Sequence, residues 1–200
     1  MSAFSVITSR VIPLPRNDID TDQIIPARFL KGTDKEGFGE HLFADWRRDP
    51  EGEPLPEFEL NQARYQGSQV LLAGVNFGCG SSREQAPWAL VAWGIRAVVA
   101  LSFADIFRAN ALKNGLLPVE VTPEVHRELV TQAQGDEGLT LSIDLEARQL
   151  TLPDGRRIAF AVEAFSHRCL VEGIDELGYL LKHEEQIAAF EGRRTTQAGV

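Results

Sequence analysis

Hydrophobic residues fall into short runs along the first two thirds of the chain and alternate with polar residues after that. Short apolar-rich runs bounded by glycine, proline or polar residues are typical of strands. Runs of this kind lie at 4–12, 69–75, 97–101 and 116–121. The sequence therefore predicts four strands in this part of the chain.

Helical patterns separate these strands. One helix is expected to begin near residues 83–84, because Pro87 is tolerated only in the first turn of a helix. Two more helices are expected at 103–113 and 123–134. Since a strand, a crossover helix and a second strand form a right-handed unit, we expect the strands that flank the first helix to be parallel.

The pattern changes after residue 138. Leucine and isoleucine alternate with polar residues over 139–145 and again over 150–162, on both sides of the turn Pro153–Gly155. Alternation around such a turn predicts a β-hairpin. Helical patterns at about 163–172 and 175–191 close the chain.

This order of elements predicts an α/β fold: a mixed parallel and antiparallel sheet flanked by helices, in one domain over residues 1–200. Residues 32–67 are rich in glycine, proline and charge. We expect them to form an active-site and surface loop region, although a disordered surface excursion would have the same composition. Residues 193–200 are expected to form a flexible tail.

Composition and charge narrow the possible functions. The formal net charge is −9, from 29 acidic and 20 basic residues. Nucleic-acid binding is not expected, because phosphate contacts need clustered lysine and arginine. No apolar run approaches the roughly 20 residues that span a bilayer, and the N-terminus lacks a signal-peptide pattern. We therefore expect a cytoplasmic protein that binds neither nucleic acid nor membrane.

The stretch from Gly74 to Gln85 concentrates the polar chemistry, with the sequence Gly-Val-Asn-Phe-Gly-Cys-Gly-Ser-Ser-Arg-Glu-Gln. It joins a predicted strand to a predicted helix, which places Ser81, Ser82 and Arg83 at a helix N-terminus. Free N–H groups and the helix dipole favour an anion there. The planar guanidinium of Arg83 suits a carboxylate or a phosphate. The glycines would let a ligand approach the backbone closely.

Other interpretations of this stretch compete with an anion site. Ser81 and Glu84 have the spacing of a capping box, in which they would only start the helix. Against this, an unpaired Arg83 would oppose the helix dipole unless an anion were present. The stretch lacks the third glycine of a dinucleotide fingerprint, the lysine of a P-loop and the Gly-x-Ser-x-Gly elbow of acyl hydrolases.

Cysteine and aspartate residues give weaker signals. Cys79 and Cys169 are the only cysteines in the sequence, and a four-iron cluster takes three or four thiolates. With no evident histidine base, Cys79 is interpreted as a small packing residue. Asp18, Asp20 and Asp22 alternate but lack the glycine and glutamate of a calcium loop, so turn capping explains them. No metal site is predicted.

Four segments carry a resemblance to a known family. They are residues 17–31, 74–85, 102–107 and 115–119. In this order they resemble the small subunits of 3-isopropylmalate dehydratase, the isomerase of leucine biosynthesis, which correspond to the swivelling domain of the aconitase superfamily. The resemblance implies a swivelling β/β/α domain and a hydro-lyase. That enzyme interconverts 2-isopropylmalate and 3-isopropylmalate by dehydration and rehydration.

The resemblance also implies roles for single residues. Ser81 matches the catalytic base, and Asp22 matches an active-site aspartate that could orient Ser81 or relay its proton. Ser82 and Arg83 match residues that bind a substrate carboxylate. Thr21, next to Asp22, is assigned to substrate binding with them.

Substrate selection is implied for the segment 28–38, which includes Leu30 and Lys35. Many family members have Thr-Arg-Thr-Gly-Phe where this chain has Asp34-Lys-Glu-Gly-Phe38. If Lys35 replaces that arginine, the charge is kept but the planar fork is lost. Related hydroxy acids such as citramalate or homoaconitate therefore stay open as substrates.

The resemblance implies a large-subunit partner. That subunit would hold a [4Fe-4S] cluster, this chain would bind no cofactor, and the active site would form at the interface of the heterodimer. Two other classes remain open: a non-catalytic anion-binding module that reuses the fold, and a hydrolase that uses serine or cysteine without a partner.

Overall fold

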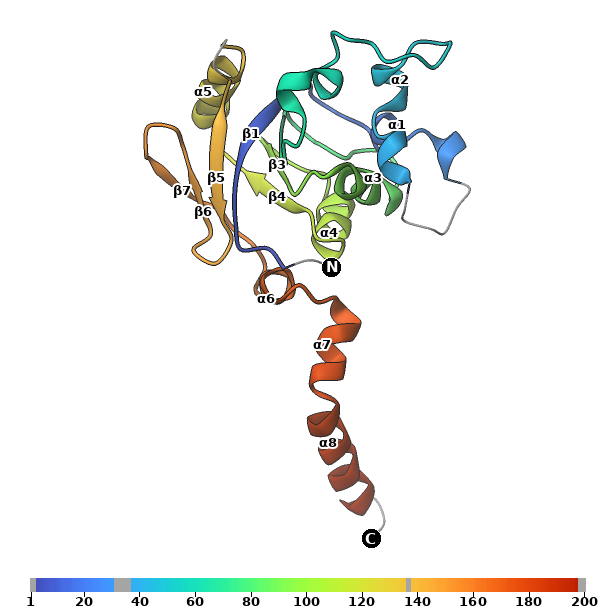
Figure 1. Cartoon of the computed structure of the whole chain (residues 1–200). Coiled ribbons are helices and arrows are strands. Elements are labelled where there is room, and N and C mark those ends of the chain that lie inside the picture. Colours follow the sequence, from blue (N-terminus) through green and yellow to red (C-terminus); the bar gives the residue numbers. More distant parts are fainter. Residues whose placement is uncertain (1–2, 31–36, 136–137, 198–200) are drawn as a thin grey trace.

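The computed structural model describes residues 3–30, 37–135 and 138–197. Within them, seven strands form one curled sheet in the order β4-β3-β2-β1-β5-β6-β7 (Figure 1). The strands are β1 Val6–Leu14, β2 Val70–Ala73, β3 Ala97–Ala100, β4 Leu117–Glu120, β5 Thr140–Asp144, β6 Gln149–Thr151 and β7 Arg157–Ala159. Strands β1 to β4 are parallel, and β1, β5, β6 and β7 pair antiparallel. The predicted mixed α/β sheet is confirmed.

Most of the α-helices lie at positions that the sequence predicts. The α-helices are α1 Thr21–Ile24, α2 Ala44–Arg47, α3 Gln85–Trp93, α4 Asp105–Lys113, α5 Pro123–Ala133, α6 Ala164–Glu172, α7 Glu176–Lys182 and α8 Glu184–Gln197. The short 3-10 helices are η1 Ala27–Phe29, η2 Phe38–His41, η3 Glu59–Asn61 and η4 Ala63–Tyr65.

The helical pattern over 175–191 is confirmed, but two helices form there instead of one. It is divided at His183, which ends α7 outside the helical region with φ −107° and ψ 10°. Glu184 and Glu185 then open α8, where two carboxylates favour a new helix N-terminus. Helix α8 continues through Gln197, into the stretch expected to be a tail. Flexibility of that stretch stays a prediction.

The parallel half of the sheet is buried on both faces. On one face, Ile12, Leu71 and Val98 pack with helices α3 and α4. On the other, Val70 and Val99 join the apolar cluster of helix α5 and strands β5 and β6. Because successive strand residues point to opposite faces, continuous apolar runs in β2 and β3 are required here.

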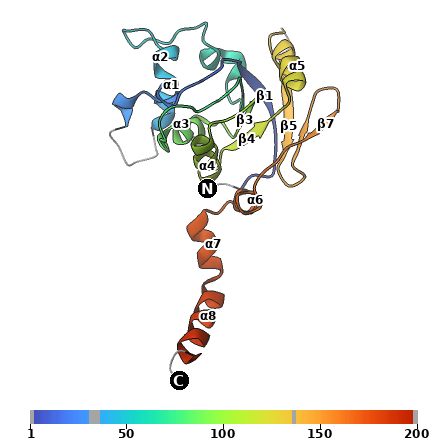
Figure 2. The same ribbon diagram turned by 180° about the vertical axis from the view of Figure 1, so that it is seen from behind.

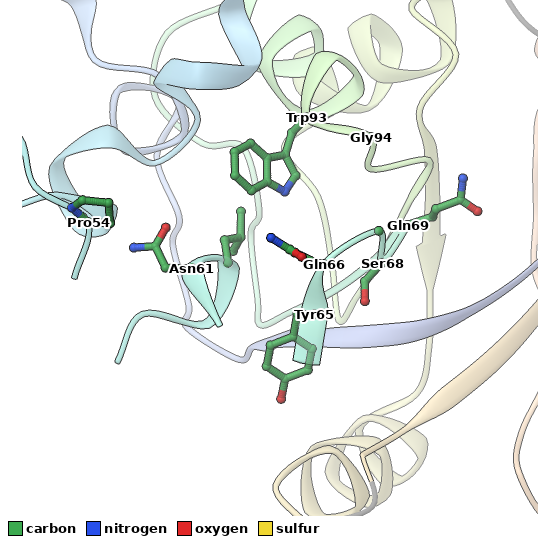
Figure 3. Close-up of a pocket in the computed structure, with 10 residues that line it drawn as sticks. Pro54, Asn61, Tyr65, Gln66, Ser68, Gln69, Trp93 and Gly94 are labelled. Carbon is green, nitrogen blue, oxygen red and sulfur yellow. The ribbon is translucent and has the colours of Figure 1, made fainter. Parts of the chain in front are cut away.

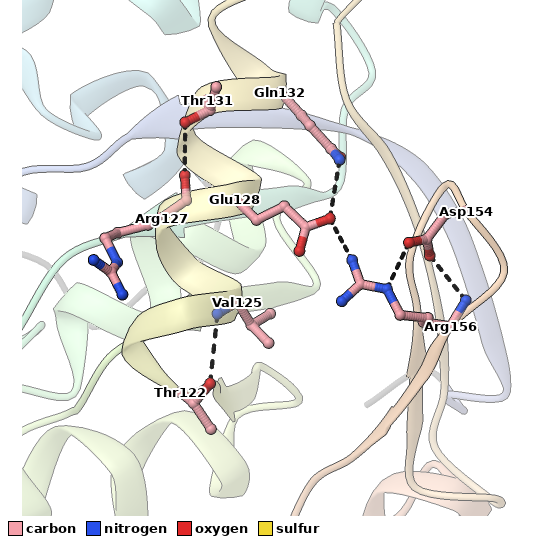
Figure 4. Close-up of polar contacts among 8 residues, drawn as sticks. All are labelled: Thr122, Val125, Arg127, Glu128, Thr131, Gln132, Asp154 and Arg156. Carbon is pink, nitrogen blue, oxygen red and sulfur yellow. Dashed lines mark hydrogen bonds and ion pairs between the residues drawn. The ribbon is translucent and has the colours of Figure 1, made fainter.

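The antiparallel half curls over the second face, as the predicted hairpin requires. Glu128 of α5 forms an ion pair with Arg156, which also bonds Asp154 in the turn between β6 and β7 (Figure 4). Ion pairs at the surface contribute little to the free energy of unfolding. These partly exposed pairs therefore mainly orient α5. Burial of Leu129 and Leu150 supplies the packing.

Strand β4 forms one edge of the sheet and carries a proline. The backbone N–H groups of Leu117 and Val121 donate to Arg96 and Ala100 on the neighbouring side, 2.9 and 3.1 Å away. Because N–H groups alternate in direction along a strand, Pro118 occupies a position whose N–H would point away from β3. Its missing donor therefore costs the ladder no hydrogen bond.

The segment from 37 to 67 is not only a surface loop. Its short helices place Phe43, Phe58 and Tyr65 in the core beside α3. Arg47 is buried there as well; its guanidinium donates to the Leu42 carbonyl and lies over the Trp93 ring. Burial lowers the pKa of Arg47 to about 10. The alternative of a disordered surface excursion does not hold for residues 37–67, which complete the core. A role of this region in the active site stays a prediction.

The packing of this segment can be tested with Phe58→Ala. Removing a buried phenylalanine should lower the free energy of unfolding by about 3–5 kcal/mol, because a cavity forms where the ring was. Urea unfolding followed by circular dichroism measures this loss. The control is Glu57→Ala at the exposed neighbour, where a change within about 0.5 kcal/mol is expected. Equal stabilities for the two variants would mean that the segment does not belong to the core.

Candidate functional site

Three of the four segments that resemble the family meet at the carboxyl end of the parallel strands, which is called the loop edge below. Each follows the carboxyl end of a parallel strand: residues 15–24 follow β1, 74–84 follow β2 and 101–104 follow β3. The N–H of Gly74 donates to the Arg16 carbonyl over 3.0 Å, and that of Phe77 to the Ser102 carbonyl over 3.0 Å. Ligands of parallel sheets bind at this edge. The fourth segment, 115–119, instead forms the buried start of β4.

Close contact between the loops explains the glycines. Gly80 has φ +89°, and a Cβ there would lie 2.1 Å from Asp20 Oδ2. At Gly74 a Cβ would lie 2.2 Å from Asn17 Oδ1. The expectation that these glycines make room for a ligand is corrected, because the chain itself occupies the space.

The capping box lies in the loop after β1 and not in the loop after β2. Asp20 Oδ1 accepts the N–H of Asp22 over 2.6 Å, and Gln23 Oε1 accepts the N–H of Asp20 over 2.9 Å. Helix α3 begins at Gln85 and receives no side-chain cap. The interpretation of Ser81 as the cap of this helix is therefore wrong.

Thr21 holds the backbone of Ser81. The Thr21 side chain is buried, with 1% of the residue exposed. Its Oγ1 accepts the Ser81 N–H and donates to the Ser81 carbonyl, each over 3.1 Å, while its own N–H donates to the Cys79 carbonyl over 2.8 Å. This buried hydroxyl holds the Ser81 backbone in place. The expected binding of substrate by Thr21 stays a prediction.

Side chains of Ser81 and Ser82 are exposed at the surface of this loop. Arg83 forms an ion pair with Asp22, and these side chains are 21% and 49% exposed. Arg83 is thus not the unpaired cation that the sequence indicated. Among the described residues the Asp22 carboxylate bonds Arg83 and not the Ser81 hydroxyl, so direct orientation of Ser81 by Asp22 is not present in this state.

The electrostatic support of Ser81 also differs from the expectation. Ser81 precedes the first residue of α3 by four positions, and the effect of a helix dipole falls off within one turn. The backbone N–H of Arg83 donates to the Ser81 carbonyl over 2.8 Å, and Arg83 is the one cationic residue in the stretch 74–85. The dipole of α3 therefore gives Ser81 little support.

Cys79 has the properties of a packing residue. Burial raises the pKa of its thiol, and the charges of Asp20 and Asp18 raise this pKa further. A thiol kept protonated is a poor nucleophile and a poor metal ligand. Over the described part of the chain, no group of histidine, cysteine, aspartate and glutamate side chains has the arrangement of a metal site.

The expected substrate-selecting residues are only partly visible. Leu30 is partly buried and packs against the core cluster that contains Phe77. Lys35 lies outside the described residues.

Asn76 also joins the loops after β1 and β2, which the sequence did not predict. It has φ +58° and donates from Nδ2 to Asp18 Oδ1 over 2.8 Å. An asparagine just before the glycines was the available signal, since asparagine tolerates positive φ.

A cleft with described lining lies at the opposite, amino end of the parallel strands. It encloses about 530 Å³ between the segment before β2 and the end of α3, with Trp93 on one wall (Figure 3). Its described lining contains Tyr65, Gln66 and Gln69 but no acid, lysine, arginine or histidine. The described lining is therefore uncharged.

Comparisons with known proteins show which family the chain belongs to. The family model of the aconitase C-terminal domain matches residues 1–124, and the LeuD_N model matches residues 127–164. A small subunit of 3-isopropylmalate dehydratase from Roseiflexus sp. (strain RS-1) is 54% identical over 194 residues, which cover 97% of this chain and 95% of that protein. This chain belongs to the family of 3-isopropylmalate dehydratase small subunits.

Other members give the same result. The small subunit from Anaeromyxobacter dehalogenans (strain 2CP-C) is 54% identical over 97% of this chain and 100% of its own length. The crystal structure of 3-isopropylmalate dehydratase (LeuD) from Methanocaldococcus jannaschii superimposes with a TM-score of 0.65 at 29% identity. That match covers 92% of this chain and 98% of that one. The small-subunit fold is thus confirmed by sequence and by structure.

Membrane insertion receives no support from the helices. None of those in the described residues has the length and apolar character that a bilayer span requires.

The role of Thr21 is tested by Thr21→Val and Thr21→Ser. Valine keeps the shape but removes both bonds to Ser81, so kcat of the assembled enzyme should fall about 10-fold or more while KM changes little. Serine should restore most of the activity. Thr122→Val controls for lost stability, because it removes the side-chain cap of α5, far from Thr21 in the sequence. This variant should leave kcat unchanged. A normal kcat in Thr21→Val would contradict the positioning role.

Proposed function

We propose that this chain, together with a large subunit, interconverts 2-isopropylmalate and 3-isopropylmalate by dehydration and rehydration. The observation that carries the proposal is the loop edge itself: an exposed serine hydroxyl beside an arginine–carboxylate pair, on segments shared with proteins named as small subunits of this enzyme. A cytoplasmic location belongs to the same proposal.

Ser81 serves as the base. It removes the proton from the carbon next to the one that loses its hydroxyl, and returns a proton when water adds back at the other carbon. A serine hydroxyl in water is too weak a base for this step. Its alkoxide needs a neighbouring positive charge in a site closed to water, and Arg83 is the one cationic residue in the stretch 74–85.

Arg83 and Ser82 bind a substrate carboxylate. The guanidinium offers several N–H donors, so Arg83 can turn one face to a substrate carboxylate while Asp22 keeps the other. In the free chain Asp22 neutralises Arg83 and keeps it in the loop. The role proposed for Asp22 is therefore to orient Arg83, and a proton relay to Ser81 would require Asp22 to move.

This chain does not fit the cluster that the family implies. Both thiols have a raised pKa because of burial, whereas iron binds thiolates, and two thiols are fewer than a four-iron cluster takes. We therefore assign the [4Fe-4S] cluster to the large subunit. From there it would supply Lewis-acid chemistry for the departing hydroxyl.

Substrate choice stays with the loop that contains Leu30 and Lys35. Leu30 borders the apolar cluster, and an apolar wall suits the isopropyl group. One methylene in such a pocket changes discrimination by only about 1–3 kcal/mol, so citramalate and homoaconitate remain alternative substrates.

Reconstitution tests the proposed function. The purified chain should be colourless and inactive, and activity on 2-isopropylmalate should require a large subunit with an intact cluster. Iron–sulfur absorbance in this chain alone would contradict the subunit assignment. Hydrolysis of an ester without the partner would support a hydrolase, and binding of isopropylmalate by the assembled pair without turnover would support a binding module.

Ser81→Ala should lower kcat by roughly 10²–10⁴-fold, the range lost when a positioned base is removed. Because the substitution removes only one hydroxyl, assembly with the large subunit should be retained. Ser82→Ala is the matched control, and it should act mainly on KM. Measurement of kcat and KM for both variants decides the assignment, and near-normal kcat in Ser81→Ala would exclude Ser81 as the base.

Arg83→Lys keeps the charge but loses the fork. A charge-assisted hydrogen bond contributes about 1.5–3 kcal/mol, so kcat/KM should fall by roughly 10–150-fold. Because Asp22 holds Arg83, the double variant with Asp22→Asn should lose less than the product of the two single losses. Independent, multiplicative losses would show that Asp22 acts on something other than Arg83.

A further inference from the structure

The last two helices form an arm that leaves the body of the molecule. In both views α7 and α8 extend away from the sheet and its covering helices (Figures 1 and 2). Leu177, Leu180, Leu181 and Ile187 on this arm are 40–63% exposed. Single exposed apolar residues are ordinary, but a group on one projecting element marks an interaction surface.

The base of the arm is attached to the body. Lys113 at the end of α4 lies 3.3 Å from the carboxylate of Glu176, and Lys182 lies 2.7 Å from Glu172. The ring of Tyr179 packs edge-on against Phe165 of α6, with 5.0 Å between the ring centroids. The direction of α7 is therefore set by contacts with α4 and α6.

Helix α4 connects the arm to the candidate site. Its first turn follows Ala104, whose N–H donates to the Phe77 carbonyl of the site loop over 3.0 Å. Its last residue is Lys113, the partner of Glu176. Nine residues of helix span about 13 Å. Ile106, on the surface of α4, is also exposed. A partner that covers the site loop would reach the arm along this helix.

The arm belongs to the part of the chain that is shared with known small subunits. The match to the Roseiflexus protein takes in 194 of the 200 residues, so it includes most of α7 and α8. A projecting arm whose sequence is shared with proteins named as small subunits fits a larger partner better than a feature of this chain alone.

We propose that the arm docks into a groove on the large subunit, resting on the proposed function for the identity of that partner. The four apolar side chains require a groove with an apolar floor. Glu184 and Glu185 open α8 at the surface, so the rim near the junction of the two helices should be basic. The arm binds the partner, and the loop edge completes the active site with it.

The experiment compares variants that differ in one side chain of the arm. Leu180→Asp and the milder Leu180→Gln change the apolar surface, whereas Gln186→Asp adds a charge at an exposed polar position of α8. The Kd of each full-length chain for the purified large subunit with its cluster is measured by sedimentation. Loss of a central apolar contact should raise Kd about 30-fold or more, and the control should stay close to wild type.

Each outcome has one meaning. Unchanged Kd in both Leu180 variants overturns the proposal. If free wild-type chains pair and the Leu180 variants separate them while Kd for the large subunit is unchanged, a second copy covers the arm and the proposal is wrong. Thermal unfolding should show the same Tm for all chains, since the changed side chains are exposed. A complex that forms normally but does not turn over isopropylmalate would refute the proposed function and leave the docking inference standing.

Discussion

The site depends on the hydrogen bonds between two loops that are far apart in the chain. Thr21 and Ser81 are separated by 60 residues, and a single buried hydroxyl joins the N–H and the carbonyl of Ser81 to the start of α1. The parallel pairing of β1 with β2 brings these loops together, because both strands end at the same edge. The fold and the placement of Ser81 therefore depend on the same pairing.

Charge in the site is balanced within the chain. Asp22 neutralises Arg83 in the free subunit, so the loop does not carry an unpaired cation into solution. Under the proposed function, a substrate carboxylate would share the guanidinium with Asp22. Selectivity for a dicarboxylate would then require further contacts from the partner or from the loop that includes Leu30.

Much of the fold follows from patterns that are local in the sequence. The apolar runs of β2 and β3, the alternation of β5 and the Pro153–Gly155 turn each determine an element without information from elsewhere. Motifs also identified Ser81 and Arg83. The features that the sequence did not predict depend on tertiary contacts. They are the burial of Thr21, the pairing of Asp22 with Arg83, the glycines that meet another loop and the core position of Phe58. Composition made residues 37–67 look like a loop because glycine and proline separate very short helices.

The two edge strands of the sheet, β4 and β7, are poor templates for further strands. Strand β7 is only three residues long, and the outward side of β4 lacks a backbone donor at Pro118. Proteins use short edge strands and proline to prevent growth of a sheet from chain to chain. A chain that has to persist before it meets its partner needs this protection, since its exposed leucines already favour association. Blocked edges leave side-chain recognition, which can be specific, as the route by which copies or partners come together.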